Sequence, residues 1–497
     1  MKKKLKKALA LGLAGVVTAG CFGGYAVPVA ADEKKDEIVE LTWYVAGQGP
    51  QADTAAVLEE ANKYLEEKIG CHLNIIATDY GNYDQKMQML ITGQEEFDLC
   101  FTSNWTNNYY NNISKNAFLE MDELLPKYAP ELYEMIPDEA WEAVTVNDKI
   151  WAIPNQQIWV YMNGFIAEKE YVDKYNFDMS SAKQLKDLEP LLQAIKDDNP
   201  DMYPFAMDQT GILGFQSTCL GYEELIGSKL PGAVELDSES GEIKVVNQYE
   251  LPQVKELFTL MHDWNQKGLI RPDAATVTEV SPDLLAGKLP VGVEGTIKPG
   301  VDAISTVRHG GRTVVSSAFT DAWMTTGSIT GTLTAISRTS KHPEKAMEFL
   351  NLVNTDEYLY NLITIGIEGK HYEKTEDGFV KVIENSGYSP NTDWMYGNNF
   401  LAYFKEGQEK TDWEKTKEIN DNAKTSPILG FSFDSTPVQN EIASVSAVLN
   451  EYILSLESGA VDPEKVMPEF LEKMKVAGSD KLIEEAQSQL DKWLASK

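Results

Sequence analysis

The sequence predicts an α/β protein of two lobes, between which the chain crosses more than once. Three observations predict it. Strand-like and helix-like segments alternate from residue 41 onward, and the alternation continues without an obvious boundary. The 497 residues allow several domains with ample core. Hydrophobic residues make up 43% and charged residues 24% of the chain, which is typical of globular proteins.

The first part of the chain predicts a doubly wound, parallel sheet. Strands are expected at 41–45, 73–77 and 97–102, and helices at 54–69 and 83–91. Val57, Ala61, Leu65 and Ile69 repeat at four-residue steps, and Gly70 is placed to end that helix. Because strands and helices alternate, the strands are expected to be parallel neighbours joined by helical crossovers.

The middle of the chain continues the alternation with shorter elements. Residues 126–151 are expected to be helical and irregular, and the following elements are strands at 151–154 and 158–162, amphipathic helices at 185–195 and 251–267, and buried strands at 289–294 and 333–337. The Gly/Thr/Ser-rich stretch 295–331 predicts loops and crossings between lobes.

The last part of the chain is predicted to be helical. Pro343 begins a helix over 343–353, Asp462 and Pro463 begin another, and apolar residues of helical period mark 438–456 and 482–493. The expected division is a first lobe of 38–154 plus about 297–345, a second lobe of 155–296 plus part of 346–427, and a helical C-terminal segment, 428–497.

The N-terminus has the pattern of a secretory signal peptide. Lysines occupy five of positions 2–7, and residues 8–19 form an apolar run that is shorter than the roughly 20 residues of a membrane-spanning helix. Two processing routes stay open. Residues 17–21 (VTAGC) resemble a bacterial lipobox in which Cys21 is lipidated after removal of 1–20, although Thr18 stands where Leu is usual. Alternatively, cleavage after Ala31 removes 1–31 and leaves a secreted protein.

The remaining cysteines, Cys71, Cys100 and Cys219, are interpreted as small buried side chains. A disulfide between Cys71 and Cys100 is the alternative that the sequence leaves open. No disulfide framework is expected to hold the fold.

Charge and motifs exclude several classes of function. The formal net charge of -33 argues against nucleic acid and anionic lipid as partners. The spacing of the five histidines and of the cysteines argues against a zinc site, and no metal or cofactor is expected. The sequence carries no P-loop and no dinucleotide-binding glycine pattern, and the stretch 327–331 (GSITG) places Ile329 where a nucleophilic serine would stand.

Aromatic residues in polar, loop-like surroundings point to a carbohydrate ligand. An indole ring stacks on the apolar face of a pyranose, while neighbouring amides and carboxylates bind its hydroxyls. Arginine occurs only at positions 271, 308, 312 and 338, which disfavours a multiply anionic ligand. The candidate ligand-binding residues are Trp105, Gln157, Trp159, Tyr161, Glu294, Trp323 and Trp394. The alternative interpretation is that each tryptophan packs in a core and that Glu294 is a solvated loop acid.

Several stretches resemble the extracellular solute-binding proteins of bacterial ABC importers, in the sugar-type family that includes maltose-binding protein. The resemblance is carried by 93–99 (GQEEFDL) and by 336–350 (ISRTSKHPEKAMEFL). The stretches 366–372 (GIEGKHY), 430–434 (GFSFD), 477–481 (AGSDK) and 489–493 (QLDKW) are similar to a subgroup of Firmicute lipoproteins that has a C-terminal domain of unassigned function.

The resemblance implies two α/β lobes joined by a hinge, each a doubly wound sheet, closing on a ligand that passes to a membrane permease without catalysis. It places Glu294 and Trp105 at strand ends where relatives contact ligand. We therefore expect a monomeric, extracellular carbohydrate-binding protein, anchored as a lipoprotein or secreted. The alternatives are a secreted carbohydrate-active enzyme, such as a glycosidase or lyase, and a binding protein for peptides or another polar solute.

Overall fold

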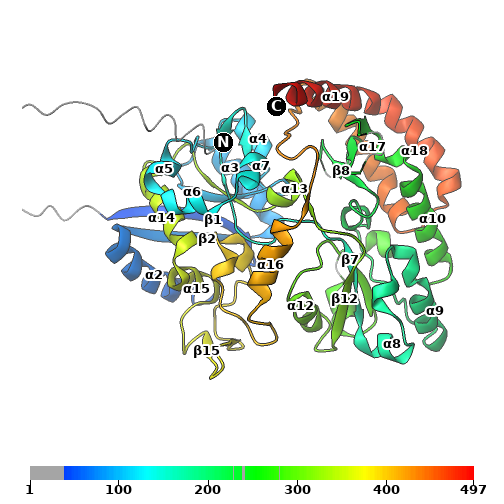
Figure 1. Ribbon diagram of the computed structural model, residues 1–497, viewed down its shortest axis with the longest axis horizontal. Helices are drawn as coiled ribbons and strands as arrows, with labels where there is room; N and C mark the ends of the chain where they lie inside the picture. Colours follow the sequence, from blue (N-terminus) through cyan, green and yellow to red (C-terminus); the bar gives the residue numbers. More distant parts are fainter. Residues whose placement is uncertain (1–37, 228, 238–240, 279) are drawn as a thin grey trace, which may run out of the picture.

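Two α/β lobes lie side by side in the computed structural model, which describes residues 38–227, 229–237, 241–278 and 280–497 (Figure 1). The expected signal segment, with Cys21, lies outside the described residues. Each lobe has its own hydrophobic core. Trp43 and Trp141 are fully buried in the first core, and Phe165 and Trp264 in the second. The predicted two-lobed α/β class is confirmed.

The first lobe is built on a mixed sheet in which β1 pairs in parallel with β2 and β3. Trp43 stands opposite Ile75 on one side and Leu99 on the other. The antiparallel strand β14 extends the sheet beyond β3. The order across the sheet is β2 (Cys71–Asp79), β1 (Val39–Gly47), β3 (Leu99–Thr102), β14 (Leu333–Ile336) and β6 (Ile153–Pro154).

Helices α2 (Thr54–Ile69) and α3 (Tyr80–Gly93) make the crossovers of this sheet, as the sequence predicts. α2 buries Val57, Ala61 and Leu65 and ends at Gly70, whose φ of 65° favours glycine. The other helices on this side are α4 (Tyr109–Ser114), α5 (Leu124–Tyr128), α6 (Pro130–Met135), α7 (Asp138–Ala143), α13 (Thr326–Ile329), α14 (Pro343–Thr355), α15 (Glu357–Ile365) and α16 (Asp412–Asp421). Small hairpins are formed by β4 (Thr145–Val146) with β5 (Lys149–Ile150) and by β15 (Tyr372–Lys374) with β16 (Val380–Val382).

The second lobe differs from a doubly wound sheet. Its main strands run in the order β11 (Val291–Glu294), β7 (Gly164–Glu168), β12 (Val314–Ala318), and both pairings are antiparallel. A smaller antiparallel sheet is made by β8 (Tyr222–Glu224), β9 (Ala233–Glu235) and β10 (Val245–Val246). The helices of this lobe are α8 (Lys169–Lys174), α9 (Glu189–Asp198), α10 (Pro252–Gln266), α11 (Ser281–Leu285) and α12 (Val301–Arg308).

Some predicted elements in this region are wrong. The strand expected at 158–162 begins later, at β7, because residues 158–162 form the passage between the lobes instead. The stretch 295–331, expected to be loops, contains α12 and β12. The helix expected at 185–195 is a 3-10 helix (Leu185–Leu188) followed by α9, with Pro190 in its first turn.

The C-terminal helices pack on the second lobe. They are α17 (Gln439–Glu457), α18 (Pro463–Ala477) and α19 (Ser479–Ser496), and Figure 1 shows them on the upper part of that lobe, with the C-terminal end of α19 close to the first lobe. Leu449, Phe470 and Leu490 are buried in the second core. The Asn265 amide of α10 donates to the Ser458 carbonyl just after α17, at 3.2 Å. This segment therefore shares a core with the lobe beside it.

Within the described residues the chain passes between the two cores at 160–165, 319–324 and 423–428. Tyr161 and Trp323 exchange backbone hydrogen bonds of 2.9 and 2.8 Å. Trp323, in β13 (Trp323–Met324), also pairs in parallel with Lys424 in β17 (Lys424–Thr425). The crossing segments thus lie side by side, and the expectation of more than one crossing is confirmed.

The predicted lobe boundaries differ from the cores at two places. Residues 297–345, expected in the first lobe, include Phe319 of the second core and β12, which pairs with β7. Part of 346–427 is expected in the second lobe, but Met347, Tyr360 and Met395 are buried in the first core. Whether a helix packs in the first or the second core depends on where the chain crosses between the lobes. The helical period of the sequence does not show where those crossings lie.

Cys71 and Cys100 are buried, free thiols. They lie in β2 and β3, which β1 separates. Two strand spacings amount to about 10 Å, which exceeds the Cα separation that a disulfide spans. The alternative of a disulfide here is therefore wrong. In the described part of the chain, no helix is both long and apolar enough to cross a membrane.

Candidate functional site

A cavity of about 520 Å³ opens between the two lobes, and we call it the cleft cavity. Trp105 and Tyr161 line it, as the sequence predicts for ligand-binding residues. Its wall on the first lobe comes from the loop after β3, from α4 and from α13. Its wall on the second lobe comes from 214–218, β8 and the loop after it, and its remaining wall comes from the C-terminal segment 428–442.

An aromatic surface adjoins this cavity at the carboxyl ends of the parallel strands, where open α/β sheets bind their ligands. Tyr80 follows β2, Trp105 follows β3, and Trp394 lies in a 3-10 helix (Asp393–Met395). The ring centroid of Trp105 is 6.4 Å from that of Tyr80 and 6.5 Å from that of Trp394. Phe101 lies beneath both indoles, at 5.8 Å from each. We call Tyr80, Trp105 and Trp394 the aromatic shelf.

Trp105 is held in place with its ring open to solvent. Its indole Nε1 donates to the Gly331 carbonyl at 2.8 Å, and its backbone N–H donates to the Ser103 Oγ at 3.2 Å. The neighbouring Asn104 amide donates to the Gly327 carbonyl at 2.8 Å. The Trp105 side chain is nevertheless 53% exposed. A ring that is fixed at its edge and exposed on its face is suited to stacking on an apolar ligand surface.

Two adjacent carboxyls of β8 line the cleft cavity. Burial raises the pKa of Glu223 to about 7, and Ser426 donates a hydrogen bond to its carboxyl. Burial also raises the pKa of Glu224 to about 7, and the Lys229 backbone N–H donates to it at 3.1 Å. Burial, together with these two carboxyls, raises the pKa of Tyr161 to about 12. Hydroxyls and protonatable carboxyls therefore surround the space beside Trp105.

Charges from both lobes face each other near the shelf. Burial raises the pKa of Glu294, although Arg308 binds its carboxylate at 3.1 Å. Burial lowers the pKa of Lys298, while the charges of Asp393 and Glu294 oppose that shift. Burial would raise the pKa of Asp393, but Lys405 and Lys298 lower it overall. Glu294 thus belongs to an ionic group beside the cleft and is more than a solvated loop acid.

The structure places Trp159 and Trp323 elsewhere. Trp159 is 4% exposed, and its indole Nε1 donates to the Asn155 carbonyl at 2.8 Å. Trp323 is also buried, in β13, with the Lys424 ammonium 5.2 Å from its ring centroid. Gln157 donates its amide to the Thr332 Oγ1 at 2.7 Å. The sequence predicts these three residues to bind the ligand, whereas the structure places them at the crossing segments and outside the lining of the cleft cavity.

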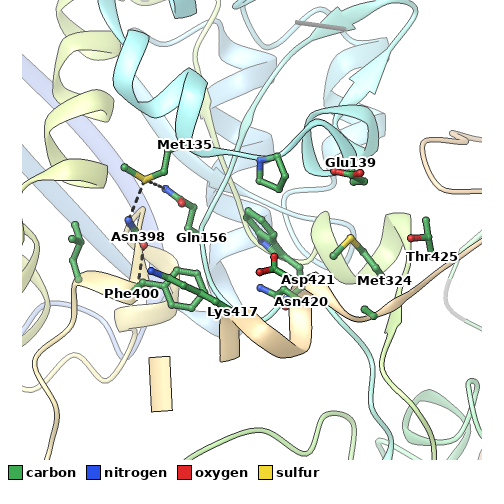
Figure 2. Close-up of a pocket in the computed structure, with 14 residues that line it drawn as sticks. Met135, Glu139, Gln156, Met324, Asn398, Phe400, Lys417, Asn420, Asp421 and Thr425 are labelled. Atoms are coloured by element: carbon green, nitrogen blue, oxygen red, sulfur yellow. Dashed lines mark hydrogen bonds between the residues drawn. The ribbon is translucent and has the colours of Figure 1, made fainter. Parts of the chain in front are cut away.

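Trp159 lines a second cavity, of about 660 Å³, beside the crossing segments, and we call it the hinge cavity. Figure 2 shows the Met135 sulfur facing the amides of Gln156 and Asn398, at 3.1 and 3.5 Å. Asn420 of α16 accepts from the Trp159 backbone N–H at 2.9 Å and donates to the Gln157 carbonyl at 2.8 Å. The hinge cavity is lined by the first lobe and the crossing segments, whereas the cleft cavity has walls on both lobes and includes the exposed Trp105, so we favour the cleft cavity as the ligand site.

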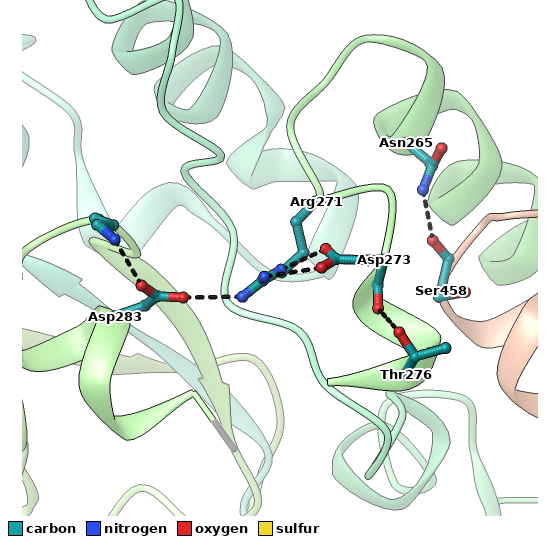
Figure 3. A network of polar contacts seen from close by, with 7 residues as sticks. Asn265, Arg271, Asp273, Thr276, Asp283 and Ser458 are labelled. Carbon is teal, nitrogen blue, oxygen red and sulfur yellow. Dashed lines mark hydrogen bonds and ion pairs between the residues drawn. The ribbon is translucent and has the colours of Figure 1, made fainter. Parts of the chain in front are cut away.

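The arginines that anchor the second lobe are committed to structural ion pairs. Figure 3 shows the Arg271 guanidinium between Asp273, at 2.7 and 3.0 Å, and Asp283, at 2.9 Å. Arg312 binds the buried Glu168 at 2.9 Å. Neither arginine lines the cleft cavity, and within the part of the chain that the structure describes its lining includes no lysine or arginine. The site therefore suits an uncharged ligand better than an anion.

Sequence reasoning missed several residues of the site. Tyr80 follows a strand directly, which is the same signal that identified Trp105. Glu223 and the stretch 431–433 carry no such signal, because their place in the cleft depends on contacts between segments about 200 residues apart, such as the bond between Glu223 and Ser426.

Comparison with known proteins identifies two regions of the chain. Residues 48–359 match the family described as bacterial extracellular solute-binding protein, and residues 427–495 match a domain of unknown function. A carbohydrate ABC transporter substrate-binding protein of Streptococcus pneumoniae serotype 4 (strain ATCC BAA-334 / TIGR4) is 32% identical over 475 residues, covering 94% of this chain and 93% of the relative.

Solved structures of an N-glycan transport solute binding protein from Streptococcus pneumoniae are similar along almost the whole chain. One has a TM-score of 0.82 at 30% identity, and its complex with Man1GlcNAc has 0.77 at 31%. Its complex with Man5GlcNAc has 0.74 at 30%. Each covers 92% of this chain and 99% of the relative.

Proposed function

This chain belongs to the bacterial extracellular solute-binding proteins, and we propose that it is the substrate-binding component of an ABC importer that captures an oligosaccharide outside the cell. The ligand is delivered chemically unchanged to permease subunits in the membrane. The observation that carries this proposal is the aromatic shelf beside the cleft cavity, with no cationic side chain among the described residues that line the cavity.

Mannose-containing and N-acetylglucosamine-containing oligosaccharides are the proposed ligand class. The shelf combines the exposed rings of Tyr80 and Trp105 with the half-buried ring of Trp394, and the centroid of Trp105 is about 6.5 Å from the other two, which suits stacking against sugar units. The side-chain amide of Asn111 and the carboxyl of Glu223 line the adjoining cavity and can bind hydroxyl groups. The N-glycan fragments bound by the similar streptococcal protein support this choice.

Binding is proposed to close the two lobes on the sugar. The site has walls on both lobes, so a ligand that contacts both stabilises the closed arrangement in proportion to its preference for that state. The TM-score to the streptococcal protein is lower for the two sugar complexes than for the structure described without a sugar. A change in the relative position of the lobes would produce such a difference.

The proposed location is the outer face of the cell membrane. The N-terminal pattern supports export, with lipidation at Cys21 or cleavage after Ala31 as the two routes. The protein is proposed to act as a monomer before it meets the permease.

A thermal-shift screen of the exported chain tests the proposed function. We expect Man1GlcNAc and Man5GlcNAc to raise the unfolding midpoint, because a ligand that binds the native state stabilises it. Mass spectrometry should recover each glycan intact. No shift with any mono- or oligosaccharide, or release of a cleaved product, contradicts the proposal.

A further inference from the structure

The cleft cavity extends beyond the aromatic shelf into a space bounded by the C-terminal segment. Ile428, Phe431, Ser432, Phe433, Ser435 and Ile442 line it, and all lie within residues 427–495, the match to the domain of unknown function. Figure 1 shows the chain after α16 running between the lobes before it enters α17. The C-terminal domain therefore packs on the second lobe and also lines the cleft cavity.

This wall is fixed by contacts with both lobes. The Gly430 backbone N–H donates to the Thr326 Oγ1 of α13 at 2.9 Å. Gly430 has a φ of 87°, and a Cβ there would come within 2.6 Å of the Glu142 Cγ. On the other side, the Phe431 ring meets Trp493 of α19 edge to face, with centroids 5.7 Å apart. These contacts hold the segment in one position, with its backbone close to the first lobe.

The facing wall is held by the same domain. The Glu457 carboxylate at the end of α17 is fully buried and accepts from the Ile212 backbone N–H at 2.9 Å. It also binds the Lys229 ammonium at 3.0 Å. Ser426, just before the segment, donates to the Glu223 carboxyl of β8. These contacts position the loops around 212 and 229 and strand β8, which form the second-lobe side of the cavity.

The chemistry of this space matches sugar hydroxyls. It combines the rings of Phe431 and Phe433 with the hydroxyls of Ser432 and Ser435, and the Glu223 carboxyl lies opposite. Trp105 belongs both to the shelf and to the cavity lining, so a chain of sugar units can continue from one to the other.

We propose that the C-terminal domain forms a subsite of the sugar site, in which segment 428–435 and strand β8 select the outer units of a branched or longer oligosaccharide. This inference rests on the proposed function. It gives the domain a role in ligand selection that a purely supporting domain would not have.

Ser432→Trp tests the subsite by filling it without removing a core side chain. Calorimetric titration compares Man5GlcNAc with Man1GlcNAc. We expect the affinity for Man5GlcNAc to fall at least tenfold, while the affinity for Man1GlcNAc stays within twofold. Ser444→Trp, exposed on α17 and outside the cavity, is the matched control and should change neither affinity.

Equal effects of Ser432→Trp on both glycans, or no effect on either, overturn the subsite while the proposed function stands. If the wild-type protein binds neither glycan, both the proposed function and the subsite are contradicted. Ser435→Trp fills the same cavity from three residues further along the segment, and it tests the subsite if Ser432→Trp does not fold. Circular dichroism and the unfolding midpoint establish folding for each variant.

Discussion

Trp105 and Trp159 each follow polar residues in the sequence, directly after Asn104 in the first case and two residues after Gln157 in the second, but they have different roles. Both indole N–H groups are satisfied by backbone carbonyls at 2.8 Å. What distinguishes them is solvent exposure, because Trp159 is packed among residues of the first core while Trp105 presents its ring at the cleft. Polar residues before a tryptophan therefore do not show whether its ring is buried or exposed, since in both cases the indole N–H can bond to a backbone carbonyl.

Trp159→Ala should therefore act on stability before it acts on binding. Truncating a buried tryptophan leaves a cavity and an unpaired Asn155 carbonyl, at a cost of about 3–5 kcal/mol in the free energy of unfolding. Denaturant unfolding measures this loss. The affinity for Man5GlcNAc of the folded variant should remain within a few-fold of wild type. If the variant keeps the wild-type stability but no longer binds Man5GlcNAc, the prediction is wrong and Trp159 contacts the ligand.

Glu223 makes stability depend on pH. Its folded-state pKa of about 7 lies above the ordinary 4.5 of glutamate, so the folded protein retains this proton at pH values where the unfolded chain has lost it. The stability that the neutral carboxyl contributes is complete below about pH 4.5 and is lost as the pH rises to 7.

Glu223→Gln keeps a neutral side chain at every pH. The free energy of unfolding of this variant should match wild type near pH 4 and exceed it by about 3 kcal/mol above pH 7. Denaturant titrations at a series of pH values measure the difference. Glu235→Gln, exposed on β9, is the control and should show no such trend. A difference that is constant with pH would contradict the assigned titration.

At the scale of elements, the sequence predicts the first sheet better than the second. α2 has the predicted bounds, and β1, β2 and β3 lie where alternation predicts them, because the crossover helices join neighbouring strands. β12 instead reaches β7 across nearly 150 residues, and its polar Ser316 and Ser317 hide the strand pattern. Long-range antiparallel pairing leaves little local signal in the sequence.

The same distinction applies to the site. Trp105 was predictable because it follows a buried strand at the sheet's carboxyl edge. Trp394 lies almost 300 residues away, and its contact with Trp105 depends on how the chain returns to the first lobe. Glu294 was predicted as a strand-end acid, yet its ionic neighbours Lys298 and Asp393 come from different lobes.

The buried pair Lys229–Glu457 joins the C-terminal domain to the loop after β8. Lys229→Met leaves a fully buried carboxylate without its cation, so the free energy of unfolding should fall by about 3–5 kcal/mol. Adding Glu457→Gln to that variant should recover a large part of the loss. Denaturant unfolding measures both.

Lys255→Met is the control for this prediction. Its partner Glu464 also links α10 to the C-terminal helices, but both side chains are exposed. Its cost should be about 1 kcal/mol or less. Equal costs for Lys229→Met and Lys255→Met would show that the buried pair does not anchor the domain.

At the scale of the whole molecule, the crossing segments permit a rigid movement of two separately packed lobes. Each lobe keeps its own core, and the strand pairing of Tyr161, Trp323 and Lys424 joins them along a narrow region. Saturation with Man5GlcNAc should reduce the radius of gyration measured by small-angle X-ray scattering. A non-binding sugar should leave it unchanged, and identical scattering with and without Man5GlcNAc would contradict closure.

Calorimetric titration of Man5GlcNAc into wild type and Trp105→Ala/Trp394→Ala tests the central claim most directly. Wild type should bind one glycan per chain, and the double variant should lose at least tenfold in affinity, because it removes both indole faces on which the sugar would bury apolar surface. Tyr203→Ala, which removes an exposed ring far from the cleft, should bind as wild type does. Undiminished affinity in the double variant would show that the sugar is held somewhere other than the aromatic shelf.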